Sequence, residues 1–223
     1  MKKSLALLFI PLLILTLSVN AQQKGDILNL MNGQTYTGVI KDTSNGKVFM
    51  DVFGKKKNKS VSFDHYRVFS YQKENETETI LYRKDTTIGN YFSQVEMKFY
   101  FLGEKDARKN YNPIGTKITS FLFCYGVALF DTYAKDSTGN FGKGFFKSEP
   151  GVATIVAPVV VTALAGIPSI QIRIDKVSNR NYLNEQTYID GFEKIGRSKK
   201  VFGALKFSVL GSVLGLATYF IAK

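Results

Sequence analysis

The stretch FLGEKDARKNY, residues 101–111, separates two halves of the chain that differ in character. The half before it is rich in short β-forming runs and ends in the aromatic run MKFYFL. The half after it contains three long apolar segments. Charges of both signs in this position fit either a polar active site or the place where a chain meets a membrane. The residues on its two sides favour the membrane and predict an α+β fold.

Residues 22–90 are predicted to form a small antiparallel β barrel or sandwich. Asn32-Gly33 and Asn45-Gly46 each follow short apolar runs, and Asn-Gly pairs favour hairpin turns because they tolerate positive φ angles. Further short runs recur at regular spacing, as in small all-β modules. In the run KVFMDVF the side chains alternate, which predicts that one face is shared by Val48, Met50 and Val52.

The turns and short strands of this module carry a recognisable set of residues, Asp26-Ile27, Asn32-Gly33, Gly38-Val39-Ile40 and Gly54. With these residues the module resembles the small SH3-like and Sm-like barrels. The resemblance implies a five-stranded barrel, and it does not extend to RNA binding, which would be misplaced outside the cytoplasm, where the signal sequence described below is expected to send the chain.

Residues 93–112 are predicted to be helical. Ser93 and Glu96 have the spacing of a capping box, in which the hydroxyl and the carboxylate each satisfy an exposed amide at the start of a helix. Gly103 is expected to interrupt or end this amphipathic helix. A second, juxtamembrane helix would then continue until the residue before Pro113, where helical geometry is disfavoured.

Residues 113–223 are predicted to form a membrane helical region with apolar segments at 114–130, 151–170 and 201–222. The segment 151–170 carries no charge, and its length matches the hydrocarbon core of a bilayer, about 30 Å thick. The segment 114–130 is shorter, and it fits a spanning helix or an interfacial segment equally well.

The last apolar segment carries a stripe of small residues. Gly211 and Gly215 form a GxxxG pattern, and Ser208 and Ser212 repeat at the same spacing of four residues. Small residues on one face let helix backbones approach each other closely in lipid. These four residues are therefore predicted to pack against another helix.

Two basic stretches flank the apolar segments and are predicted to lie at the membrane surface. Within the first, Arg108 and Lys109 precede the segment 114–130. Within the second, EKIGRSKK, Arg197, Lys199 and Lys200 precede the last segment. Basic residues near an anionic bilayer contribute about 1 kcal/mol each to membrane binding.

The charge of the loops favours two membrane spans over three. With an exported N-terminus and three spans, the basic loop 173–200 would lie outside, against the positive-inside tendency. If 114–130 does not span, the loop lies inside and the tendency is obeyed. The preferred arrangement is a transmembrane helical hairpin of 151–170 and 201–222, with 114–130 lying against it or dipping into the interface.

Residues 1–21 have the features of a secretory signal peptide, with a basic start, an apolar run and a small-residue cleavage site. An uncleaved membrane anchor is the alternative. Together with the family resemblance described below, export predicts a location in the bacterial cell envelope with the N-terminal module in the periplasm. The inner membrane is favoured over the outer, because outer-membrane spans are usually strands of closed barrels.

Charge and cysteine content exclude several classes of function. The formal charge is +12, and removing Lys2 and Lys3 with the signal peptide leaves +10. An exported protein rarely meets nucleic acid, so the expected partner for this charge is membrane lipid. The one cysteine, Cys124, cannot form an internal disulfide or a cysteine-based zinc site, and it lies in an apolar run.

Two separated motifs flank the apolar segments. The first is Gly103-Glu104-Lys105-Asp106-Ala107 with Tyr111, and the second is Tyr188 and Gly191-Phe192 with Arg197-Ser198-Lys199-Lys200. With these motifs the chain resembles a family of exported, membrane-associated proteins of Bacteroidetes-type bacteria that have no assigned activity. The resemblance covers most of the mature chain and implies an envelope membrane protein, without supplying a function.

No known catalytic motif is present in the sequence. The one histidine, His65, has no evident nucleophile beside it, and the chain has no GxSxG, HExxH or Walker pattern. We therefore expect no enzyme activity, no cofactor and no metal. The favoured function is a non-catalytic envelope protein that presents its β module to other envelope proteins, to wall material or to a second copy of itself. The alternative is a small oligomeric transport or pore component assembled through the Gly-rich helices, with Lys117 and Lys206 facing an aqueous path.

Overall fold

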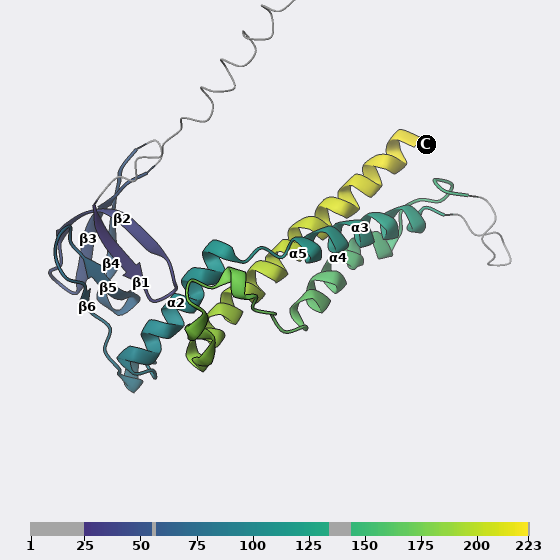
Figure 1. Cartoon of the computed structure of the whole chain (residues 1–223). Coiled ribbons are helices and arrows are strands. Elements are labelled where there is room, and N and C mark those ends of the chain that lie inside the picture. Colours follow the sequence, from purple (N-terminus) through teal and green to yellow (C-terminus); the bar gives the residue numbers. More distant parts are fainter. Residues whose placement is uncertain (1–24, 55–56, 134–143, 223) are drawn as a thin grey trace, which may run out of the picture.

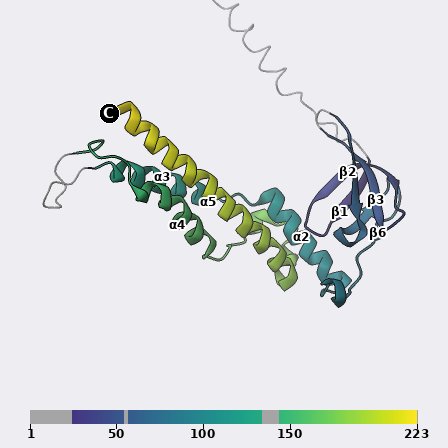
Figure 2. The ribbon, with the colours of Figure 1, turned by 180° about the vertical axis from the view of Figure 1, so that it is seen from behind.

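The computed structural model describes residues 25–54, 57–133 and 144–222. Figure 1 shows an elongated molecule with a β module at one end, one helix beside it and three further helices extending away from it. Figure 2 shows the same order from behind. The chain is α+β, as predicted. The expected signal peptide, residues 1–21, lies outside the described residues.

The β module is a single six-stranded antiparallel sheet with the strand order β4-β3-β2-β1-β5-β6. Its outer strands β4 and β6 do not pair with each other within the described residues, so the sheet is open and the prediction of a closed barrel is wrong. The strands are β1 (Asp26–Leu30), β2 (Thr35–Asp42), β3 (Lys47–Val52), β4 (Lys59–Asp64), β5 (Val68–Gln72) and β6 (Thr79–Ile80).

Both Asn-Gly pairs lie in hairpin turns, as predicted. Asn45 and Gly46 both have positive φ angles, 54° and 70°, which is the geometry of a type I′ turn between β2 and β3. Between β1 and β2 only Gly33 has a positive φ, 74°. Residues 31–34 connect the two strands, and Leu30 N donates to Gln34 O at 2.9 Å across the turn.

Alternation along the strands builds the core of the module. Val48 and Met50 are buried and Val52 is partly buried, whereas Phe49 between them is exposed, which confirms the predicted face of β3. Leucine and aromatic side chains from the neighbouring strands complete this cluster. Its buried members are Leu28, Leu30, Ile40, Val48, Met50, Phe63 and Val68.

Helix α2 (Gln94–Asn110) lies beside the module and begins with the predicted capping box. Ser93 N donates to the Glu96 carboxylate at 2.7 Å, and Glu96 N donates to Ser93 Oγ at 3.3 Å. The helix passes through Gly103 without interruption, so the prediction of a break there is wrong. Gly103 instead serves a close approach to another helix, described below.

Three helices follow: α3 (Ile114–Asp131), α4 (Val152–Gly166) and α5 (Gln186–Ala222). At 1.5 Å per residue, the 18 residues of α3 extend about 27 Å, the 15 of α4 about 22 Å and the 37 of α5 about 55 Å. By length and composition, α3 and α5 could each cross a membrane. The segment 151–170, predicted as the strongest span, forms the shortest of the three helices, because α4 ends two residues before Pro168.

The bundle of α3, α4 and α5 has small residues inside and large apolar residues outside. This is the reverse of a water-soluble core and suits a bundle whose outer face meets lipid. Its buried positions include Cys124, Ala128, Ala157, Ala204, Ser208, Gly211, Ser212 and Gly215. Its exposed positions include Leu122, Phe123, Val152, Ile155, Val159, Leu164, Phe202, Val209, Val213 and Phe220.

The predicted hairpin placed residues 173–200 on the opposite side of the membrane from the module, whereas the structure brings both to the same end of the helical bundle. The first half of α5 packs along α2, and the connection before α5 contacts α2 as well. The module, α2 and residues 173–200 therefore lie at one end of the bundle. The other end is marked by Asp131, whose Oδ2 accepts hydrogen bonds from Gly151 N and Thr154 N at the start of α4.

Candidate functional site

The strongest cluster of buried polar groups lies where α2 crosses α5. Two glycines allow the helix backbones to touch at this crossing. A Cβ atom added at Gly103 would overlap the carbonyl oxygen of Tyr188, and one added at Gly191 would overlap the carbonyl oxygen of Tyr100. Any larger side chain at either position would push the helices apart.

Asp106 is the centre of a buried hydrogen-bond network at the crossing. Its Oδ2 atom accepts hydrogen bonds from Tyr188 OH at 2.7 Å, from Ser178 N at 2.8 Å and from Ser178 Oγ at 2.7 Å. Tyr188 is fully buried, and its pKa is raised by burial and by the hydrogen bond to Asp106. The network joins α2 to α5 and to the loop that follows the short helix η3 (Ile174–Lys176).

Glu104 is fully buried on the side of α2 that faces the module. Lys194 Nζ lies 3.0 Å from its Oε1 atom, but neither carboxylate oxygen receives a hydrogen bond of good geometry from a described residue. Burial raises the pKa of Glu104, and the positive charges of Lys194 and Arg108 oppose that rise only in part. The ionised carboxylate is thus held in an environment that disfavours its charge.

Contacts of α2 with the sheet fix the module to the helices. Arg108 Nε donates to Asn32 O at 2.8 Å, and Gly33 lies directly against the backbone of Glu104. Phe69 of β5 stacks on Phe101 of α2 with ring centroids 5.5 Å apart. The positive φ of Gly33 thus serves both the hairpin turn and the contact with α2.

Lys199 closes the C-terminal end of α2. Its Nζ donates to the carbonyl oxygens of Ala107, Arg108 and Tyr111 at 3.1, 2.5 and 2.9 Å. Arg108 O is among the last carbonyls of the helix, which helix ends leave without intrahelical partners, whereas Ala107 O also accepts from Tyr111 N and Tyr111 lies just beyond the helix. Lys199, predicted at the membrane surface, therefore binds within the protein.

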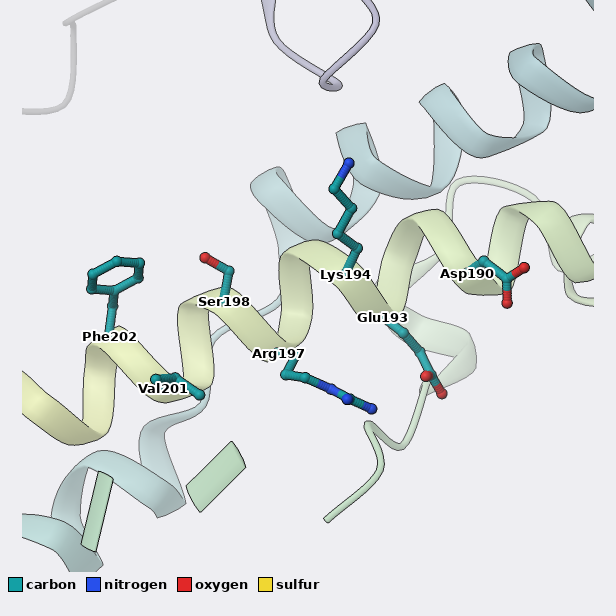
Figure 3. Close-up of a pocket in the computed structure, with 7 residues that line it drawn as sticks. All are labelled: Asp190, Glu193, Lys194, Arg197, Ser198, Val201 and Phe202. Atoms are coloured by element: carbon teal, nitrogen blue, oxygen red, sulfur yellow. The ribbon is translucent and has the colours of Figure 1, made fainter. Parts of the chain in front are cut away.

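The remaining residues predicted at the membrane surface differ in their surroundings. Lys109 and Arg197 are exposed, whereas Lys200 Nζ donates to Pro168 O at 3.3 Å. Figure 3 shows Lys194 extending from α5 towards α2, with Ser198 and Phe202 further along the same side. These residues belong to an open groove of about 540 Å³ that is lined by α5 alone.

The predicted packing residues lie between α5 and its two neighbours. A Cβ added at Gly211 would overlap the Phe121 carbonyl oxygen of α3, and one added at Gly215 would overlap the Ala128 side chain. Ser208 and Ser212 are buried beside them. Ser212 Oγ donates to Thr154 O of α4 at 3.2 Å, and Ser208 Oγ donates to Leu205 O within α5.

The site is suited to holding elements in place. The Asp106 oxygen that points into the network is already occupied by three donors, and Glu104 has no open path to solvent because its side chain is fully buried. Among the described residues, no group of three or more His, Cys, Asp or Glu could hold a metal ion. His65 lies in the short helix η1 (His65–Arg67) of the module.

Sequence reasoning missed the roles of Glu104 and Asp106, which were expected to face lipid headgroups. A usable signal was present in the helical spacing of Gly103, Asp106 and Ala107, which places two small residues and a carboxylate on one face. The two motifs that carry the family resemblance prove to be spatial neighbours, since Gly103 and Asp106 meet Tyr188.

Comparisons of the chain with protein-family models, with curated protein sequences and with solved structures give no match.

A pH-dependent contribution to stability is expected from Glu104. Because its pKa is raised on folding, the folded protein binds the proton more tightly than the unfolded chain. Its contribution is therefore fully present below about pH 4.5, the ordinary pKa of a glutamate, and is lost as the pH rises through the raised value. Glu104→Gln should remove this loss, so the melting temperature of the variant relative to wild type should increase between pH 4.5 and pH 8.

Circular dichroism melts of the two proteins in detergent across that pH range measure the effect. Lys194→Met serves as the matched variant. Removing this positive charge should raise the pKa of Glu104 further, so the total loss of stability with rising pH should be larger than in wild type. Parallel pH profiles for wild type and Glu104→Gln would contradict the assignment of a raised pKa to this carboxyl.

Proposed function

We propose that the protein is a non-catalytic membrane component of the bacterial cell envelope that holds its β module at the membrane surface for contacts with other envelope proteins. The observation that carries this proposal is that two structural features occur together in the chain. An inside-out helical bundle suited to lipid is joined to the module through the buried α2–α5 crossing.

The module offers side chains suited to binding a protein. Val39, Phe49 and Tyr66 are exposed on it by 50%, 38% and 65%. Aromatic residues that remain accessible on a small β module are common anchors in protein interfaces. The resemblance to exported Bacteroidetes-type envelope proteins agrees with this proposal.

We infer that the module faces the periplasm and that the bundle lies in the inner membrane. This orientation leaves basic residues of 173–200 outside, against the positive-inside tendency. Three of these basic side chains have partners within the protein. Lys194 lies against Glu104, and the ammonium groups of Lys199 and Lys200 donate to backbone carbonyls. The exposed remainder would lie near the headgroups of the outer leaflet.

Labelling of introduced cysteines in intact cells tests this placement. In a Cys124→Ala background, cysteines at Lys73 of the module and at Gln171 before α5 should react together with a membrane-impermeant reagent. A cysteine at Glu149, at the opposite end of the bundle, should react only after the inner membrane is permeabilised. Equal reactivity of all three positions in intact cells would refute a spanning bundle.

Photocrosslinking tests the interaction role. A photoreactive amino acid at Phe49 or Tyr66 should capture the same envelope protein, or a second copy of this chain, in repeated experiments. The control position is Ile221 near the end of α5, which should not capture that partner. The absence of a reproducible partner from either module position would argue against the role.

A further inference from the structure

A basic groove lies where the polar end of the molecule meets the apolar bundle. It is formed between the α2–α3 connection and α5 and has a volume of about 500 Å³. Four lysines from three helices line it, Lys109 of α2, Lys117 of α3, and Lys199 and Lys206 of α5. No aspartate or glutamate is among its lining residues.

The positive charge in the groove is not neutralised by carboxylates. Lys199 donates to the carbonyls at the end of α2. Lys117 donates to Asn112 Oδ1 at 2.8 Å and lies over the Phe207 ring, 5.9 Å from its centroid, so neither lysine has a carboxylate partner among the described residues. Lys109 and Lys206 are exposed, and neither forms an ion pair within the described part of the chain. Two anchored ammonium groups and two free ones thus surround one space.

The repulsion between the neighbouring positive charges affects the pKa of Lys199. Its pKa is lowered first by burial and then by the positive charges of Arg108 and Lys117. An anion in the groove would relieve this repulsion. The first turn of α3, which contributes Lys117, also brings the positive end of a helix dipole, and that end favours anions.

The apolar residues around the groove indicate that the ligand has an apolar part as well as an anionic group. Pro113, Phe202 and Phe207 line it together with the lysines. From there the exposed apolar surfaces of α3 and α5 continue along the bundle. A small soluble anion would use the lysines and leave this apolar surface bare, whereas an amphiphile with an anionic head would use both.

We propose that this groove binds the phosphate headgroup of an anionic membrane lipid, with the acyl chains lying along α3 and α5. The inference rests on the membrane placement proposed above. It makes the lysines a defined lipid site, which differs from a general attraction of a basic surface to a bilayer.

Native mass spectrometry of the full chain in detergent, titrated with phosphatidylglycerol or phosphatidylcholine, tests the site. Wild-type protein should retain one phosphatidylglycerol molecule in preference to phosphatidylcholine. Lys109→Gln/Lys206→Gln should weaken that binding about 30-fold, since each basic residue near an anionic surface contributes about a factor of five. Both lysines are exposed and free of ion pairs, so the variant should fold normally.

The matched control is Lys98→Gln/Arg197→Gln, which removes two exposed charges from the same two helices outside the groove. It should bind phosphatidylglycerol as wild type does. Equal weakening in both variants would overturn the site in favour of diffuse attraction, and so would equal retention of the two lipids. Displacement of the lipid by millimolar inorganic phosphate would instead identify a site for soluble anions.

Failure of this proposal can be told apart from failure of the proposed function. Phase separation in Triton X-114 is measured first on the same protein. Partition into the aqueous phase would overturn both the membrane placement and the lipid site. Partition into the detergent phase without selective lipid binding would overturn the lipid site alone.

Discussion

Gly103→Leu should lower the free energy of unfolding by at least about 3 kcal/mol. The side chain would have to enter the space taken by the Tyr188 carbonyl and the Phe192 amide of α5. These are backbone groups of a continuous helix, so they cannot move aside as a flexible side chain would, and overpacking of this kind commonly costs about 1–3 kcal/mol or more. For a chain of this length, a loss of that size lowers the melting temperature by about 6–12 °C.

Circular dichroism melts in detergent measure this change, and Gly126→Leu provides the matched control. Gly126 lies inside α3, and a Cβ added there would meet no atom within 4 Å. That variant should melt within about 2 °C of wild type, since exposed substitutions usually change stability by no more than about 0.5 kcal/mol. Similar losses for both variants would show that the α2–α5 crossing is not the tight contact described here.

Asp106→Ala should destabilise the protein by about 3 kcal/mol. The substitution leaves the fully buried Tyr188 hydroxyl without its acceptor, and an unpaired buried donor costs about 1–3 kcal/mol. It also removes charge-assisted bonds to Ser178, which are stronger than neutral ones. Asp106→Asn should cost only about 1 kcal/mol, because its amide oxygen can still accept from the same donors.

A double-mutant cycle separates this network from a general loss of packing. Combining Asp106→Ala with Tyr188→Phe should give less than the sum of the two single effects, with a coupling energy of about 1 kcal/mol, because each substitution alone removes the hydrogen bond between the two side chains. Asp190→Ala, at an exposed position of α5, is the control and should change stability by less than about 0.5 kcal/mol. Strictly additive effects of Asp106→Ala and Tyr188→Phe would refute the network.

The elements that sequence patterns predicted well are those set by local chemistry. Both Asn-Gly turns, the capping box at Ser93 and the alternation of β3 depend on residues within a few positions of one another. The small-residue stripe at Gly211 and Gly215 likewise lies against neighbouring helices. In each case the preference of the residue and its place in the fold agree.

What could not be predicted depends on contacts between distant parts of the chain. Gly103 was expected to break a helix because glycine is a poor helix former, but its lack of a side chain is what the crossing with α5 requires. Glu104 and Lys199 were assigned to the membrane surface because they lie in charged stretches beside apolar segments. In the structure Glu104 is fully buried with Lys194 nearby, and Lys199 is partly buried with its ammonium on carbonyls at the end of α2.

The sequence distance across the Asp106 network has a consequence for biogenesis. Ser178 and Tyr188 lie 72 and 82 residues after Asp106, so the network cannot form until α3 and α4 have been synthesised and the start of α5 has emerged. Until then α5 does not yet cover Asp106 and Gly103 of α2, which are buried in the complete protein. A nascent chain that ends before Tyr188 would therefore lack the hydroxyl that joins Asp106 to α5, and its α2 would not yet be held against that helix.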